Sequence, residues 1–96
     1  MITLTTIVQP PAAVIATALD GEEMVLLHLD TQHYYTLNAT GSHLWHDLVA
    51  GLSLADASRR LGARYALTPE AATQATLTLV QELTAEQLLH PVAASG

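Results

Sequence analysis

The chain has 96 residues, half of them hydrophobic, and a net charge of −6 with neutral histidines. This length supports one domain with one modest core, and the lack of cysteine excludes disulfides, thiolate metal sites and a cysteine nucleophile. The first nine residues lack a basic segment and a long apolar run, and no apolar run reaches the roughly 20 residues of a membrane span. We therefore expect a cytoplasmic protein without a membrane partner.

The N-terminal third of the chain predicts an arm followed by strands. Residues 1–11 end in two prolines and predict a flexible arm, although Ile2, Leu4 and Ile7 could add a short strand. Residues 12–19 and 24–29 have strand composition, and Asp20-Gly21 between them is typical of a hairpin turn.

A third strand is predicted at residues 33–37, after a turn at residues 30–32. Side chains alternate between the two faces of a strand. The side chains expected on the face toward the helices are Val25, Leu27, Leu29, Tyr35 and Leu37.

Three helices are predicted after the strands. The first spans residues 39–50, with Asn38 as its N-cap and Gly51 as a left-handed residue at its end. The second follows Ser53 and spans residues 54–61, or extends to residue 64.

The third predicted helix spans residues 69–83 and has the clearest start, with Thr68 as cap and Pro69 at the first position. Its expected core face comprises Ala72, Ala75, Thr76, Leu79 and Leu83. Leu88 and Leu89 are expected to close the core before a frayed tail at residues 91–96.

These elements predict a domain over residues 12–90. Three strands followed by three helices indicate an α+β fold that is winged helix-turn-helix-like, with a three-stranded antiparallel sheet.

Metal binding and catalysis have little support in the sequence. His43 and His46 lie three residues apart, but Asp47 points elsewhere on the helix, so a third ligand is missing. No serine lies in a nucleophile motif, and there is no glycine-rich phosphate loop. We expect no cofactor, no metal and no enzymatic activity.

A winged helix commonly reads DNA with its last helix, so a DNA-binding module is the alternative from a different functional class. Here residues 69–83 contain no Lys or Arg and carry Glu70 and Glu82. Anionic side chains oppose contact with phosphates, so we expect no nucleic-acid partner.

The only positive side chains other than histidine are Arg59, Arg60 and Arg64. On the predicted boundaries they lie in the last turn of the second helix, where cations complement the helix dipole. They could instead contact acidic groups of a partner. The sequence favours the dipole interpretation and does not exclude the second.

Two features favour peptide binding. The strand at residues 33–37 runs directly into a helix, which indicates an open sheet edge. The third helix also carries apolar residues beside its core face. On a helical wheel one flank, at 80–140° from Ala72, holds Thr73, Leu77, Val80 and Thr84. This flank could line a groove or simply widen the core face, and periodicity does not separate the two.

The same stretch carries a family resemblance. The first matching residues are Tyr34, Tyr35, Leu37, Asn38, Gly41, Trp45, Leu48 and Gly51. The second, less specific set is Tyr65, Leu67, Glu70, Leu79, Leu83, Leu88 and Leu89. Together, over about residues 14–89, they resemble the PqqD-like family. Gln87 departs from the pattern, since the family often has glycine there, and this puts the closing turn in question.

The resemblance implies a RiPP recognition element, a non-catalytic domain that binds the leader of a ribosomally synthesised precursor peptide. The leader would add as a strand to the third strand, pack against the third helix and reach a separate maturation enzyme. A stand-alone lasso-peptide B1 protein, which serves a leader peptidase, is favoured over a peptide chaperone of pyrroloquinoline quinone synthesis, which serves a radical enzyme.

The expected site follows from the edge strand, the helix flank and the resemblance. Backbone groups of the strand would bind the peptide, and side chains would form its pockets. The expected peptide-binding residues are His33, Tyr34, Tyr35, Thr36, Leu37, Thr73, Thr76, Leu77, Val80 and Thr84.

Overall fold

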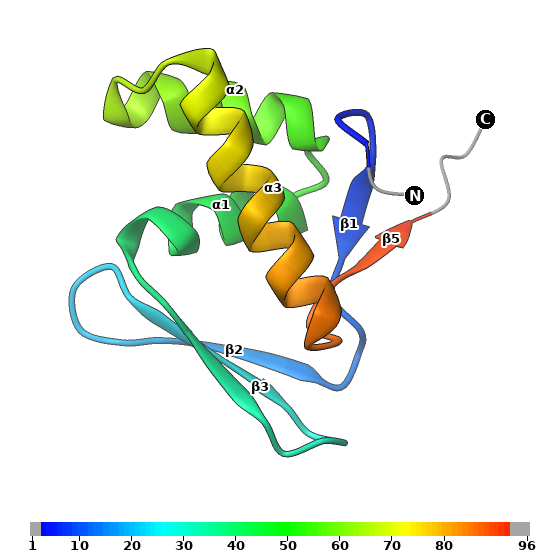
Figure 1. Ribbon diagram of the computed structural model, residues 1–96. Coiled ribbons are helices and arrows are strands. Elements are labelled where there is room, and N and C mark those ends of the chain that lie inside the picture. The colour runs from blue at the N-terminus through cyan, green and yellow to red at the C-terminus, as the bar shows by residue number, and fades with distance from the viewer. Residues whose placement is uncertain (1–2, 93–96) are drawn as a thin grey trace.

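The protein, described at residues 3–92 of a computed structural model, places three helices on one side of a three-stranded sheet. The sheet contains β2 (Val14–Ala18), β3 (Met24–His28) and β4 (Tyr34–Leu37), all antiparallel, with β3 in the middle. The helices are α1 (Ala39–Val49), α2 (Leu54–Tyr65) and α3 (Pro69–Ala85). The predicted α+β order of three strands and three helices is confirmed. In Figure 1, α3 crosses in front of α1 and runs from α2 down to the sheet.

A second, two-stranded sheet corrects the prediction of a loose arm, and of the predicted frayed tail it includes residues 91 and 92. The strand β1 (Ile7–Gln9) pairs antiparallel with β5 (His90–Val92), and Val8 is completely buried. The carbonyls of Thr6 and Leu4 accept hydrogen bonds from the first two backbone N–H groups of α2, at 3.0 and 2.8 Å. These N–H groups have no partner within the helix, so the arm satisfies them. Residues 1–2 and 93–96 lie outside the described part of the chain.

The core-facing side of β3 differs from the prediction. Met24, Leu26 and His28 are buried, whereas Val25 and Leu27 are half-buried and Leu29 is exposed. On β4 the prediction is correct, because Tyr35 and Leu37 face the helices.

The pairing register gives the reason. Leu26 lies opposite Tyr35, and Met24 lies opposite Leu37. Directly paired residues share one face of a sheet, so the even-numbered residues of β3 face the core. Apolar residues occur in both alternating sets of this strand, so its sequence alone could not select the face.

The helix ends follow their capping residues. The Asn38 side chain accepts a hydrogen bond from the Gly41 N–H at 2.8 Å, and Thr68 Oγ1 accepts one from Ala71 N–H at 3.1 Å. Gly51 adopts the expected left-handed conformation, with φ +101°. The helix α2 reaches Tyr65 and ends at the left-handed Ala66. It is therefore longer than the predicted span of residues 54–61 and agrees more closely with the alternative that extends to residue 64.

The core lies between the sheet and the helices and is mostly leucine. Its aromatic anchor is Trp45, which is 3% exposed, and the predicted closing residues Leu88 and Leu89 are both buried. Ala72, Thr76 and Leu83 face the core as predicted, and Ala75 and Leu79 are only partly buried. Val80, assigned to the flank, is a core residue.

The closing turn after α3 forms in spite of Gln87. This residue has a φ of +61°, the Leu88 N–H donates to the Leu83 carbonyl at 2.8 Å, and the Gln87 N–H donates to the Thr84 carbonyl at 3.0 Å. This pair of bonds is a Schellman motif, whose left-handed position is usually glycine. The family-typical turn is therefore present with a strained residue in it.

Replacing Gln87 with glycine is expected to stabilise the protein by about 1 kcal/mol, because a left-handed side-chain residue costs roughly 1–2 kcal/mol. Urea unfolding followed by circular dichroism measures the change. The control is Glu86→Gly, at the preceding exposed position without positive φ, which should lower stability. Equal effects of the two glycines would contradict the assignment of strain to Gln87.

Candidate functional site

Both outer strands of the three-stranded sheet have an unpaired edge within residues 3–92, and the edge of β4 lies beside a groove. The strand β4 pairs with β3, and within residues 3–92 no strand lies on its other side. The His28 N–H donates to the His33 carbonyl at 2.9 Å, which makes these two residues a hydrogen-bonded pair. Bonded and non-bonded pairs alternate along an antiparallel ladder. The backbone N–H and C=O groups of Tyr34 and Thr36 therefore point outward, away from β3.

A groove of about 320 Å³ lies where β4 runs into α1, against the middle of α3. Its lining residues are Asn38, Thr40, Gly41, Leu44, Ala75, Thr78, Leu79 and Glu82. Leu44 and Leu79 give it an apolar wall, and Glu82 places a carboxylate beside it. The open edge and the groove form one candidate site for an extended chain.

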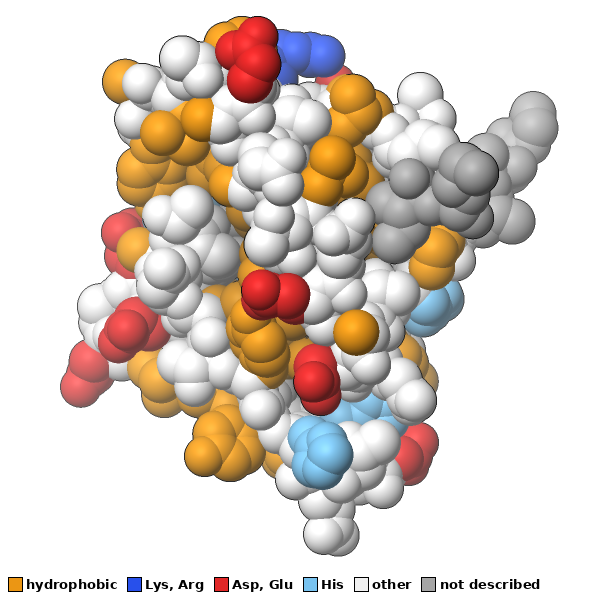
Figure 2. Space-filling view, viewed as in Figure 1, with side chains coloured by type: hydrophobic (Ala, Val, Ile, Leu, Met, Phe, Trp, Pro, Cys, Tyr) orange, Lys and Arg blue, Asp and Glu red, His pale blue; other side chains and the backbone are white. Residues whose placement is uncertain are grey.

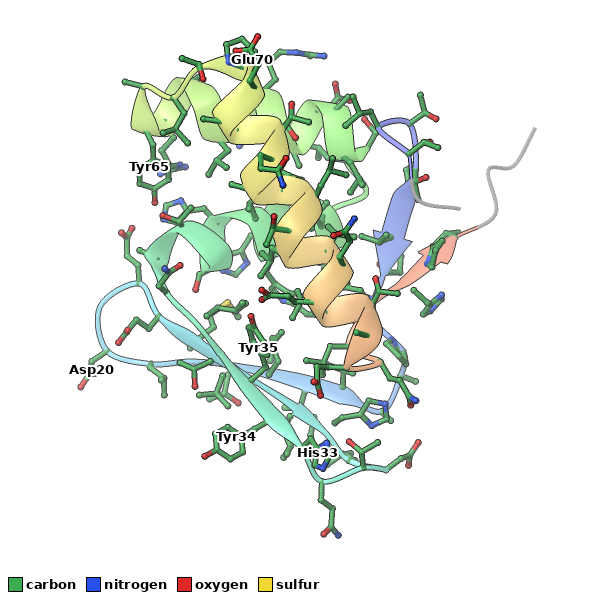
Figure 3. The ribbon with its side chains drawn as sticks, in the orientation of Figure 1. Asp20, His33, Tyr34, Tyr35, Tyr65 and Glu70 are labelled. Carbon is green, nitrogen blue, oxygen red and sulfur yellow. The ribbon has the colours of Figure 1, made fainter. Side chains whose placement is uncertain are left out.

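A hydrogen bond joins the strand to the helix beside this groove. The Tyr35 hydroxyl donates to the Glu82 carboxylate, and His33 Nδ1 lies 4.0 Å from a Glu86 carboxylate oxygen. Figure 3 shows Tyr35 between β4 and α3, whereas Tyr34 points away from the helices. The hydrogen bond to Glu82, together with burial and the charges of Glu82 and Glu86, raises the pKa of Tyr35 to about 12.

Alkaline titration should detect this contact. Because the pKa of Tyr35 is raised above its ordinary 10.0, the neutral hydroxyl stabilises the fold fully below pH 10, and this contribution is lost as pH rises through about 12. Phenolate absorbance should therefore show a last ionisation near pH 12 that Tyr35→Phe removes. The control Tyr34→Phe, at an exposed ring, should keep this step. A late step that survives Tyr35→Phe would contradict the assignment.

Several predicted site residues lie elsewhere. Thr76 and Val80 are 0% exposed, so their side chains lie in the core rather than in the groove. For Val80 the wider core face is the correct interpretation. Tyr34 is 73% exposed on the face of the sheet opposite Tyr35, so its side chain does not line the groove either.

The flank of α3 beside the groove is not the predicted one. Thr73 lines a different cavity, between α2 and α3. Helical spacing places Leu77 and Thr84 on the same side as Thr73, away from Ala75 and Leu79. Sequence reasoning missed the lining residues Ala75, Thr78, Leu79 and Glu82. The sequence carried no local signal for them, because helical spacing had placed Ala75 and Leu79 on the expected core face.

The described residues support neither a metal centre nor a membrane span. In residues 3–92 no three His, Asp or Glu side chains gather as metal ligands would. His43 Nε2 instead contacts Glu22 at 3.1 Å and ties the β2–β3 loop to α1. None of the helices in this part of the chain combines the length and apolar character needed to cross a membrane.

Comparison with known proteins identifies the family. Residues 23–89 match the family described as coenzyme PQQ synthesis protein D, PqqD. The chain belongs to the PqqD family. The resemblance recognised in the sequence is thereby confirmed, and no curated protein matches.

Two solved structures are similar to this PqqD-family chain. One is TbiB1 in complex with the TbiA(beta) leader peptide, at 28% identity and a TM-score of 0.81, covering 88% of this chain and 98% of that one. The other is a lasso peptide synthetase B1 complexed with the leader peptide, at 25% identity and a TM-score of 0.81, covering 88% of this chain and 99% of that one. Both therefore share the fold over nearly their whole length.

The geometry explains parts of the PqqD-family motif. A Cβ atom at Gly41 would lie 3.2 Å from Leu37 Cδ2 and 3.4 Å from Asn38 Oδ1. Glycine thus lets the first turn of α1 fold tightly against the end of β4. This places the N-terminus of α1 beside the groove.

Proposed function

We propose that this protein is a non-catalytic adaptor that binds the leader of a ribosomally synthesised precursor peptide and presents it to a separate maturation enzyme. The observation that carries the proposal is the open edge of β4 beside an apolar groove, in a chain whose similar structures were solved with leader peptides. Because the precursor is a ribosomal product, we place this step in the cytoplasm.

The leader would add as a fourth strand. Its backbone would exchange hydrogen bonds with Tyr34 and Thr36, which requires little of its sequence. Alternate side chains would enter the groove beside Leu79. Burying two or three apolar side chains contributes roughly 1.5–3 kcal/mol each, before the cost of ordering the peptide. The carboxylates of Glu82 and Glu86 favour a Lys or Arg in the bound segment.

Two pathways fit the PqqD family. The lasso-peptide role, with a leader peptidase as partner, is favoured because both similar structures are described as B1 proteins or leader-peptide complexes. A peptide chaperone in pyrroloquinoline quinone synthesis is the second candidate, favoured by the family description itself. Titration with the two kinds of precursor leader separates them, because the adaptor should bind its own leader at least tenfold more tightly.

The direct test is a titration of the cognate leader followed by amide NMR. We expect micromolar or tighter binding, with the largest shifts at residues 33–37 and in the second half of α3. Shifts confined to α2, or no binding at micromolar concentrations, would overturn the proposal. Retardation of DNA at low salt would support the alternative class instead. Precursor processing by the protein alone would show it to be an enzyme.

A matched pair of leucines tests the groove. Leu77 and Leu79 are both half-buried on α3, but only Leu79 lines the groove. Leu79→Ala should weaken leader binding about tenfold, because the apolar contact it loses is worth roughly 1.5 kcal/mol. Leu77→Ala should leave the dissociation constant within about twofold. Isothermal titration measures both, and the reverse ranking would place the peptide on the other flank of α3.

A further inference from the structure

All three arginines of the chain lie on α2, and the helix dipole accounts for only one of them. Because α2 extends to Tyr65, its last turn contains Arg64 but not Arg59 or Arg60. The stabilisation of cations by the dipole is confined to that last turn. The interpretation favoured by the sequence therefore fails for two of the three residues.

Two of the three arginines form ion pairs within the fold. Arg59 contacts Asp56 and Arg60 contacts Asp47, each at 3.1 Å, with the arginine side chains 76% and 61% exposed. The Arg59–Asp56 pair is exposed on both sides, and such pairs typically contribute about 0–1 kcal/mol, whereas Asp47 is only 21% exposed and its pair with Arg60 joins α1 to α2. Arg64 forms no ion pair within residues 3–92. The three arginine side chains are exposed, but the charges of Arg59 and Arg60 are partly offset by Asp56 and Asp47.

These residues form one continuous surface. Arg59, Arg60, Ala63 and Arg64 are exposed and lie at helical spacing on the outward side of α2, and we call them the arginine face. In the view of Figure 2, arginine side chains appear only at the top, over α2, next to an acidic side chain, and the other acidic side chains lie lower, over α3 and the sheet.

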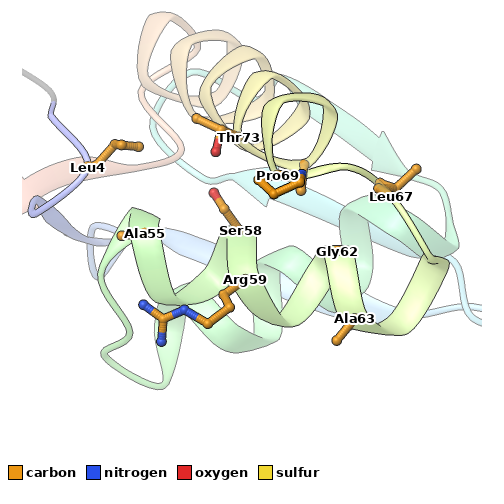
Figure 4. Close-up of a pocket in the computed structure, with 10 residues that line it drawn as sticks. Leu4, Ala55, Ser58, Arg59, Gly62, Ala63, Leu67, Pro69 and Thr73 are labelled. Carbon is orange, nitrogen blue, oxygen red and sulfur yellow. The ribbon is translucent and has the colours of Figure 1, made fainter.

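An apolar groove borders the arginine face. A cavity of about 530 Å³ lies between α2 and the start of α3, and both Arg59 and Ala63 line it (Figure 4). Leu4 and Leu67, two of its other lining residues, are exposed large hydrophobic side chains. An apolar centre with arginine at its border is the usual composition of a protein–protein interface.

Charge selects the kind of partner. The chain has nine acidic residues and only these three arginines, and Asp56 and Asp47 already pair with Arg59 and Arg60. An acidic group of a partner can therefore find a cation only on α2, where Arg64 is the first candidate. Figure 1 places α2 at the end of the molecule opposite the sheet, away from the open edge of β4. A peptide on β4 therefore leaves the arginine face uncovered.

We propose that the arginine face and its apolar groove dock the maturation enzyme through a segment that combines apolar side chains with Asp or Glu. This inference rests on the proposed adaptor function, because it takes the partner to be the enzyme that acts on the leader-bound precursor. The adaptor then holds the leader at one end and the enzyme at the other.

The test compares binding of two probes, the leader peptide and the purified maturation enzyme, to the same variants of the full chain. Replacing Arg59, Arg60 and Arg64 together with glutamine should weaken enzyme binding at least tenfold and leave leader binding within twofold. Ala63→Glu, which keeps all three arginines, should weaken enzyme binding similarly. Wild-type enzyme binding should also weaken as salt rises from 50 to 300 mM.

The outcomes separate this inference from the proposed function. Unchanged enzyme binding in both variants, or no binding of the enzyme to the wild-type chain, would overturn the proposed docking surface. Leader binding by the wild-type chain would still support the adaptor function. Failure of the leader to bind wild-type protein would overturn the adaptor function. The enzyme titration would then still show whether the arginine face binds the enzyme. DNA retardation or self-association that the glutamine variant abolishes would assign the face to another occupant.

Discussion

Replacing Thr36 with proline is expected to reduce leader binding by 10- to 100-fold and leave the fold intact. The Thr36 N–H points to the open edge of β4 rather than to β3, so proline removes no hydrogen bond of the sheet. It removes a donor to the incoming peptide and leaves a leader carbonyl without a partner. Such an unsatisfied group costs about 1–3 kcal/mol, and each 1.4 kcal/mol is a factor of ten in affinity.

The matched control is Ala16→Pro. The Leu29 N–H donates to the Ala13 carbonyl, so the alternation of the ladder points the Ala16 N–H to the free edge of β2. Ala16 is exposed and lies on the opposite edge of the same sheet. Proline there imposes the same backbone restriction without touching the candidate site. Isothermal titration should show loss of binding for Thr36→Pro only. Equal binding by both variants would exclude strand addition at β4.

Replacing Trp45 with alanine is expected to lower the free energy of unfolding by about 3–5 kcal/mol. The side chain is 3% exposed and is the largest member of the core cluster, so truncation leaves a cavity between α1 and its neighbours. Small domains are stable by only about 5–15 kcal/mol, so this loss should leave the variant partly unfolded at 37 °C. Chemical unfolding followed by circular dichroism measures the change, since the variant lacks tryptophan fluorescence.

His46→Ala is the control for this change. His46 lies next to Trp45 in α1 but is exposed, so its replacement should change stability by no more than about 0.5 kcal/mol. A loss of similar size in both variants would contradict the assignment of the effect to burial of Trp45.

The local signals of the sequence located most elements correctly. Asn38 and the Thr68-Pro69 pair start α1 and α3 because capping needs only neighbouring residues. The open strand at residues 33–37 was predicted for the same reason, since too little chain separates β4 from α1 for a crossover.

What the local signals left undecided is which face of each element points inward. Met24, Leu26 and His28 face the core instead of Val25, Leu27 and Leu29, because cross-strand register set the face of β3. On α3, Val80 is buried and Leu79 borders the groove, because the helix packs into the core through the face that holds Ala72, Thr76, Val80 and Leu83.

The sequence by itself determined the order of the three sheet strands and three helices, the helix caps and the open strand, because those depend on residues a few positions apart. Only the tertiary structure decided the groove and the pairing of β1 with β5, which joins residues about 80 positions apart along the chain. It also decided the position of the arginines on α2 relative to the last turn. These features depend on which side chains face each other across packed elements, and apolar residues on both sides of β3 and α3 made those faces indistinguishable in sequence.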